Sequence, residues 1–306
     1  MEKGLYIKSA DVDIRTSQES KLAGLLLEAM YNGQDLPDQF VSNKLAMNLA
    51  KILTKYSRLI PEAKNIGITG SMKGSGCFFT GGVDSFYTFS CNPEVKLLVY
   101  VEGFDIPLKE KDFMGVVVKR LREAAKEMGK ELAVLQTNYR DEAKVVPWEQ
   151  QFGSALVMIA MSLQNHLNKM YIAGGEGLWG QQKEIDELWS TETMEIIHHG
   201  DVSRIEKIKA ISTIPTAMKH LRVCWESTTE YNCGKCEKCL RTLTQFYIAG
   251  KLEAVKSFGK VTVRSLSDAI DRLGKLDGKE LDFTKSNHEA CPKGIIEESL
   301  FKLINK

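Results

Sequence analysis

Two short stretches of this chain hold residues whose types and spacing could do chemistry. The first reads Thr-Gly-Gly-Val-Asp-Ser over 80–85 and follows the apolar residues 77–79, as a short buried strand would turn into a loop that opens a helix. Gly81 and Gly82 lack a Cβ atom, so the backbone there can approach a ligand closely. Amides at a helix N-terminus attract anions. The stretch predicts a phosphate site, although Gly-Gly before Asp-Ser is also ordinary turn chemistry.

The second stretch is a group of cysteines spaced Cys-x8-Cys-x2-Cys-x2-Cys: Cys224, Cys233, Cys236 and Cys239. Four thiolates at this spacing can close tetrahedrally on zinc. Gly234 gives the turn between the second and third ligands conformational freedom, and the nearby lysines reduce repulsion between thiolates. Four protein ligands leave no open position for water or substrate, so we expect a structural Zn²⁺. Cys77, Cys91 and Cys291 are interpreted as ordinary thiols.

The first stretch resembles the PP-loop, the Ser-Gly-Gly-x-Asp-Ser signature of the N-type ATP pyrophosphatases, with Thr80 keeping the hydroxyl of the first serine. In that superfamily the loop holds the β and γ phosphates of ATP, so that a substrate attacks the α phosphorus and pyrophosphate departs. A PP-loop followed, after about 140 residues of alternating structure, by this cysteine spacing resembles the 7-cyano-7-deazaguanine synthases of the queuosine pathway. The resemblance covers 76–249.

Members of that family adenylate the carboxylate of 7-carboxy-7-deazaguanine and use ammonia and ATP to form an amide and then a nitrile. The resemblance implies an ATP-dependent C–N ligase, a structural Zn²⁺ on the four cysteines, and a homodimer. We also expect Mg²⁺ to bridge the β and γ phosphates with help from Asp84. Asp84 and Ser85 are the expected catalytic residues. The residues expected at the ATP phosphates are Thr80, Gly81, Gly82, Val83, Asp84 and Ser85.

The chain also departs from the family pattern. A prefix of 75 residues precedes the loop, a tail follows residue 249, and the segments 147–153 and 174–177 differ from the family's substrate-facing sequences. We therefore expect ATP use to be retained, with 7-carboxy-7-deazaguanine or another small-molecule carboxylate as substrate. A relative recruited to macromolecule modification or phage defence falls within this reading.

Strand and helix patterns alternate from residue 76 on, which predicts an α/β fold with a parallel sheet and helices on both faces, of the HUP type. The expected domains are an N-terminal α+β prefix (1–75), a nucleotide-binding domain (76–211) and a zinc-binding helical region (212–306). The expected strands are 5–14, 65–69, 77–79, 95–101, 131–137 and 170–173. The expected helices are 17–30, ended by Asn32-Gly33, then 38–56, 110–128 and 150–167.

Four charged residues lie at or after expected strand ends: Glu102, Asp105, Arg140 and Glu176. Because ligands bind beyond the carboxyl ends of strands in open α/β sheets, they are candidate nucleotide or substrate contacts, sharing one pocket with the loop at Thr80. The segment 177–195, with Trp179 and Trp189, is either a lid or an excursion without function. His198 and His199 point to opposite faces of a strand, so we expect one buried and one exposed histidine rather than a shared metal site.

Composition excludes several classes of protein. The 306 residues are 43% hydrophobic and carry a formal net charge of +1, without a long apolar span, so we expect a cytoplasmic protein that does not contact a membrane and has no general affinity for nucleic acid. Two alternatives to the ligase stay open. One is a PP-loop enzyme that thiolates tRNA, which the near-neutral charge disfavours. The other is a non-catalytic nucleotide-binding scaffold.

Overall fold

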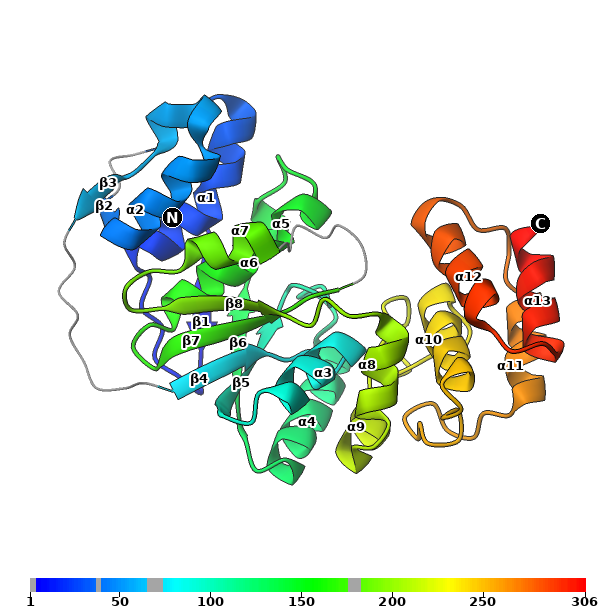
Figure 1. The fold of residues 1–306 in the computed structure, drawn as a ribbon. Helices are drawn as coiled ribbons and strands as arrows, with labels where there is room; N and C mark the ends of the chain where they lie inside the picture. The colour runs from blue at the N-terminus through cyan, green and yellow to red at the C-terminus, as the bar shows by residue number, and fades with distance from the viewer. Residues whose placement is uncertain (1–3, 37–39, 65–73, 176–182) are drawn as a thin grey trace. The chain divides into compact units, whose positions relative to one another are not determined.

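A computed structural model of the chain describes residues 4–36, 40–64, 74–175 and 183–306. The protein has an α/β fold with a mostly parallel six-stranded sheet flanked by helices (Figure 1). Two compact units are built from interleaved segments. Unit 1 comprises the described residues of Met1–Phe79, Cys91–Lys109 and Gly129–Asp201, and unit 2 comprises Thr80–Ser90, Glu110–Met128 and Val202–Lys306.

Unit 1 holds both sheets. Its strands are β1 (Ile7–Ser9), β2 (Phe40–Ser42), β3 (Glu62–Lys64), β4 (Gly74–Phe78), β5 (Val95–Glu102), β6 (Glu131–Thr137), β7 (Leu167–Ala173) and β8 (Glu195–His199). Its helices are α1 (Gln18–Asn32), α2 (Asn43–Ile52), η1 (Thr54–Leu59), α5 (Tyr139–Glu142), α6 (Trp148–Ser162), α7 (Lys183–Asp186) and η2 (Glu187–Trp189).

The main sheet has the order β1-β6-β5-β4-β7-β8, in which β1 is an antiparallel edge strand and the other pairs are parallel. The strand order reverses at β4, which pairs with β5 on one side and β7 on the other. Such a reversal is the position at which open α/β sheets bind ligands. Phe79 extends the pairing of β4 with β5 by one residue, because its N–H donates to the carbonyl of Val99 (2.8 Å). The Thr80–Ser85 segment follows Phe79 directly in the chain.

The prefix helices share one hydrophobic core with this sheet. Leu22 of α1, Leu45 of α2, Val99 of β5 and Ile159 of α6 are buried in a single cluster. Helix α1 packs closely on α6, because a Cβ atom on Gly24 would lie 2.9 Å from the sulfur of Met158. The α1 boundaries agree with the sequence prediction, since the Ser17 side chain caps its start and Gly33, with φ +65°, caps its end.

The helix expected over 38–56 is wrong in its extent. Phe40–Ser42 forms β2 instead, parallel to β3, and the helix begins at Asn43 because the Ser42 hydroxyl accepts the N–H of Leu45 (3.3 Å) and caps it. The chain then turns into the 3₁₀ segment η1, whose Tyr56 has non-helical dihedral angles. The helix expected over 150–167 is also wrong in its extent, because α6 ends at Ser162 and β7 begins at Leu167. The strand expected over 65–69 lies outside the described residues.

Unit 2 is mainly helical apart from the Thr80–Gly82 loop and the cysteine segment. Its helices are α3 (Val83–Cys91), α4 (Lys111–Glu127), α8 (Arg204–Ile211), α9 (Pro215–His220), α10 (Glu237–Ile248), α11 (Val263–Asp271), α12 (Gly278–Ala290) and α13 (Ile295–Ile304). Among the described residues, every helix is too short or too polar to cross a membrane. The division of the chain at residues 75 and 211 and the HUP assignment stay predictions.

Candidate phosphate loop and metal centre

The glycine loop has the backbone geometry that its sequence predicts. Gly81 has φ +73°, in the left-handed region, and a Cβ atom there would lie 2.9 Å from the side chain of Leu121. Its carbonyl accepts the N–H of Arg222 (2.8 Å), and the carbonyl of Gly82 accepts the N–H of Phe86 (3.0 Å). Helix α3 begins at Val83, so its first amides, which have no intrahelical acceptor, belong to the loop. This backbone can receive an anion.

The polar residues of the loop have different surroundings. Ser85 is buried and donates its hydroxyl to the carbonyl of Gly82 (3.1 Å), which stabilises the first turn of α3. Thr80 is half-buried, and its hydroxyl lies 3.3 Å from the position of a Cβ atom built on Gly82. The structure therefore brings the six loop residues predicted from the sequence into one turn. Within that turn, the Ser85 hydroxyl is hydrogen-bonded to the carbonyl of Gly82.

Asp84 forms ion pairs with two buried cations. Lys207 lies 2.8 Å from Oδ1 and Arg204 lies 3.1 Å from Oδ2, and the two basic side chains are 1% and 6% exposed. Burial pushes the pKa of the Asp84 carboxyl upward, but the charges of Arg204 and Lys207 outweigh burial and hold the pKa below its ordinary value. The loop therefore lies beside the positive charges of Arg204 and Lys207. The Asp84 carboxylate reduces the repulsion between these two cations.

Sequence reasoning missed Arg204 and Lys207, although a local signal was present. Ser203 and Glu206 form a capping box, in which each side chain bonds the backbone N–H of the other residue. A Ser-x-x-Glu pattern predicts a helix start at this position. Residues three apart on a helix lie on one face, so the pattern also places Arg204 and Lys207 side by side. The sequence does not indicate which carboxylate they face.

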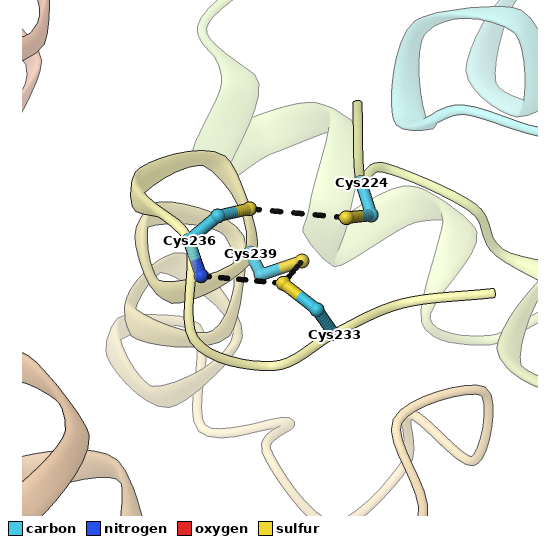
Figure 2. A group of neighbouring side chains, drawn as sticks. All are labelled: Cys224, Cys233, Cys236 and Cys239. Carbon is cyan, nitrogen blue, oxygen red and sulfur yellow. Dashed lines mark hydrogen bonds between the residues drawn. The ribbon is translucent and has the colours of Figure 1, made fainter. Parts of the chain in front are cut away.

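The four predicted metal ligands lie together in unit 2, as Figure 2 shows. Their sulfur atoms all lie within 4.8 Å of one another, and the pairs Cys224–Cys236 and Cys233–Cys239 are each separated by 3.9 Å. Tetrahedral Zn²⁺ with bonds of about 2.3 Å needs sulfurs about 3.8 Å apart. The four sulfur atoms and the distances between them therefore fit a zinc ion, and the cluster could hold a metal.

Local structure prepares the cysteines for a cation. Gly234, with φ +65°, allows the tight turn between Cys233 and Cys236, and the N–H of Cys236 points to the sulfur of Cys233 (3.3 Å; Figure 2). The contact with Cys239 lowers the pKa of the Cys236 thiol to about 6. A lowered pKa favours the thiolate of Cys236, which is the form that binds a metal.

No protein-family model, curated protein or solved structure matches the chain.

The remaining candidates lie in unit 1 or outside the described residues. Glu102 accepts a hydrogen bond from Gln136 (2.8 Å), and Asp105 is exposed. Arg140 donates to the carbonyl of Phe104 and stacks 5.2 Å from the ring centroid of Trp148. Glu176 and Trp179 lie outside the described residues. Their proposed roles, and a pocket shared with the Thr80 loop, stay predictions.

One of the two histidines is buried, as expected, but the other is half-buried rather than exposed. His198 is 7% exposed, whereas His199 is half-buried and has its ring edge-on to Tyr171. Nδ1 of His198 bonds Asp186 (2.7 Å) and Nε2 bonds Asp201 (2.8 Å). These three side chains hold the end of β8 to α7 within unit 1. Trp189 is buried and belongs to the hydrophobic core.

Proposed function

We propose that the protein is an ATP-dependent ligase that adenylates a small-molecule carboxylate and transfers the acyl group to ammonia or an amine. The observation that carries the proposal is the glycine loop at the start of α3, with the buried cations Arg204 and Lys207 beside Asp84. A helix N-terminus and two nearby cations form a site for a polyanion such as a triphosphate.

In this proposal, the amides of Val83, Asp84 and Ser85 bind the β and γ phosphates of ATP. Arg204 and Lys207 supply positive charge for the pyrophosphate as it leaves. A carboxylate oxygen attacks the α phosphorus and the bond to the β phosphate breaks. The amine nitrogen then attacks the acyl carbon, loses a proton and releases AMP. Phosphoryl transfer needs positioning and charge neutralisation more than a protein nucleophile.

Asp84 does not fit the expected part of a Mg²⁺ ligand. Both of its carboxylate oxygens are already within 3.1 Å of cationic nitrogens, and a divalent ion there would meet their repulsion. We therefore derive no step from Mg²⁺ on Asp84 and assign this carboxylate to positioning Arg204 and Lys207. The four cysteines fit Zn²⁺, which would stabilise unit 2 without taking part in chemistry.

The test is pyrophosphate release from ATP in the presence of ammonium, with and without 7-carboxy-7-deazaguanine. The proposal expects stoichiometric AMP and pyrophosphate with that acid or with another member of a panel of heteroaromatic acids. Lys207→Gln should lower the rate at least tenfold, because it removes a charge beside the phosphates. Ser90→Ala is the matched control on α3, since Ser90 is exposed and its hydroxyl bonds only locally to the carbonyl of Tyr87 among the described residues.

The outcomes separate the competing functions. Binding of ATP without pyrophosphate release from any acid would favour the nucleotide-binding scaffold. Release of pyrophosphate that depends on tRNA and a sulfur donor would favour the thiolating enzyme. Failure of the zinc-loaded protein to bind ATP would refute all three readings.

A further inference from the structure

Two hydrogen-bonded routes within unit 2 connect the cysteine cluster to the glycine loop. The first is a backbone route. Arg222 donates its N–H to the carbonyl of Gly81 (2.8 Å) and lies two residues before the metal ligand Cys224. The Asn232 side chain holds this segment by accepting the N–H groups of Val223 (2.9 Å) and Cys224 (3.3 Å). Asn232 itself directly precedes the next ligand, Cys233.

The second route passes through side chains. Cys236 occupies the residue directly before α10, and Cys239 lies in the first turn of that helix. Thr242, one turn further along, accepts a hydrogen bond from Nη2 of Arg204 (3.3 Å), while Nη1 of the same guanidinium bonds Asp84 (3.1 Å). Thr242 is fully buried and also donates to the carbonyl of Lys238 (2.8 Å). The position of Arg204 at the loop thus depends on the position of α10.

A metal ion is the group that joins the two routes. The segment before Cys224 and the start of α10 are separate pieces of chain, and four sulfur–metal bonds would fix them to each other. Without those bonds, ligands of this kind lose their order. Both Gly81, through Arg222, and Asp84, through Arg204, would then lose a fixed partner.

We propose that the metal in the cysteine cluster sets the affinity of the glycine loop for phosphate, through the bonds Arg222–Gly81 and Thr242–Arg204–Asp84. Thr242 is a positioning residue in this proposal. The inference rests on the proposed function in one respect, namely that the loop binds the phosphates of ATP. In this proposal the zinc ion does more than stabilise the fold, because its presence changes the affinity of the glycine loop for phosphate.

A pair of isosteric substitutions on one helix tests the coupling in the full chain. Thr242→Val removes the hydroxyl that bonds Arg204. Thr244→Val is the matched control, because Thr244 is equally buried and its hydroxyl has no hydrogen-bond partner in the described part of the chain. Three quantities are measured for both variants and wild type: zinc content, the Kd for ATP, and deuterium uptake of the 80–90 peptide.

The coupling predicts one zinc per chain in all three proteins. The Kd for ATP should rise about tenfold in Thr242→Val, as for loss of one buried bond to a charged group, and stay within twofold in Thr244→Val. Removing zinc from wild type with a chelator should weaken ATP binding as well. Removal from Thr242→Val should weaken it by a smaller factor, because part of the route is already broken.

Two results would overturn the coupling: equal ATP affinity of zinc-loaded Thr242→Val and wild type, or unchanged deuterium uptake of 80–90 when zinc is removed. The uptake measurement needs no nucleotide. If wild type fails to bind ATP, and yet zinc removal speeds exchange in 80–90 more than in the α11 peptide 263–271, the proposed function fails while the mechanical coupling stands. The two failures are therefore distinguishable.

Discussion

Nδ1 of His198 lies 2.7 Å from Oδ2 of Asp186, and both side chains are buried. The other ring nitrogen bonds Asp201, which is half exposed. Burial alone would lower the pKa of His198, but the hydrogen bonds to the two carboxylates outweigh burial and raise the pKa above its ordinary value. The folded chain therefore favours the protonated form of His198, which links β8 to α7 through Asp186.

This link predicts a pH-dependent stability. Because the pKa is higher in the folded chain, the stabilisation is complete below the unfolded value of about 6.5 and is lost as the pH rises through the folded pKa. His198→Gln should lower the free energy of unfolding by about 3 kcal/mol at low pH, and by less at high pH. Urea unfolding from about pH 5 to about pH 9 measures this, within the range of histidine titration. His166→Gln is the control for loss of a histidine outside this cluster, since its ring contacts the carbonyl of Asp13.

Replacing Asp84 should destabilise the protein in a way that phosphate reverses. Asp84→Asn leaves Arg204 and Lys207 beside each other without the carboxylate, at a cost of about 3 kcal/mol. A bound anion can replace the missing charge, so added phosphate should raise the Tm of Asp84→Asn more than that of wild type. Thermal unfolding in a phosphate series measures the effect. Asp112→Asn, an exposed carboxylate of α4, should behave like wild type.

The same carboxylate predicts a loss of stability in acid. The pKa of Asp84 is lower in the folded chain than its ordinary value, so its contribution is present above the unfolded pKa and is lost as the pH falls through the folded pKa. Unfolding free energies of wild type and Asp84→Asn should therefore converge at low pH. A difference that stays constant down to about pH 2, below the ordinary range of aspartate, would contradict the ion pairs.

Two glycine substitutions in unit 2 should act in opposite directions. Gly81→Ala should destabilise by roughly 1–3 kcal/mol, because φ is +73° and the new methyl group would meet Leu121. Gly115→Ala, in the interior of α4 where a Cβ atom has nothing within 4 Å, should stabilise by about 0.5–1 kcal/mol. Chemical denaturation measures both. An unchanged Gly81→Ala protein would show that the left-handed turn is absent in solution.

Metal binding should depend on the cluster and not on cysteine in general. Wild type and Cys291→Ser should each hold one zinc per chain, since Cys291 is outside the cluster, whereas Cys236→Ser should lose it. Loss of the ion should lower the Tm by on the order of 10 °C. Atomic spectrometry and thermal unfolding with and without chelator measure these. Equal zinc content in Cys236→Ser and wild type would refute the site.

The local chemistry of the chain predicted its local structure well. Gly33, Gly81 and Gly234 were each expected where backbone freedom is required, and each has a left-handed φ. The cysteine spacing is likewise a local rule, because two of its three intervals are short enough to be fixed by one turn and one helix start. Strand periods predicted β5 and β6 to within one residue for the same reason.

Relationships between distant residues were not predictable in this way. Asp84 was expected to face a metal ion, but it faces Arg204 and Lys207, a pairing that depends on how α8 packs rather than on any pattern around residue 84. The assembly of each unit from three separate segments of the chain also could not be predicted from local sequence patterns. The strand β2 was missed because Phe40–Ser42 is short, and only its pairing with β3 distinguishes it from the start of the next helix.

The ion pair between Lys207 and Asp84 joins residues 123 positions apart. A ribosome adds roughly 5–20 residues per second, so Asp84 is made on the order of ten seconds before the cations that it pairs with. During that time the glycine loop has left the ribosome without its basic partners or its link to Arg222. A nascent or truncated chain that ends before α8 would therefore have the strand and the glycines of the loop but neither basic partner of Asp84 nor the bond from Arg222 to Gly81. The complete arrangement around the loop would arise only when the last third of the protein is made.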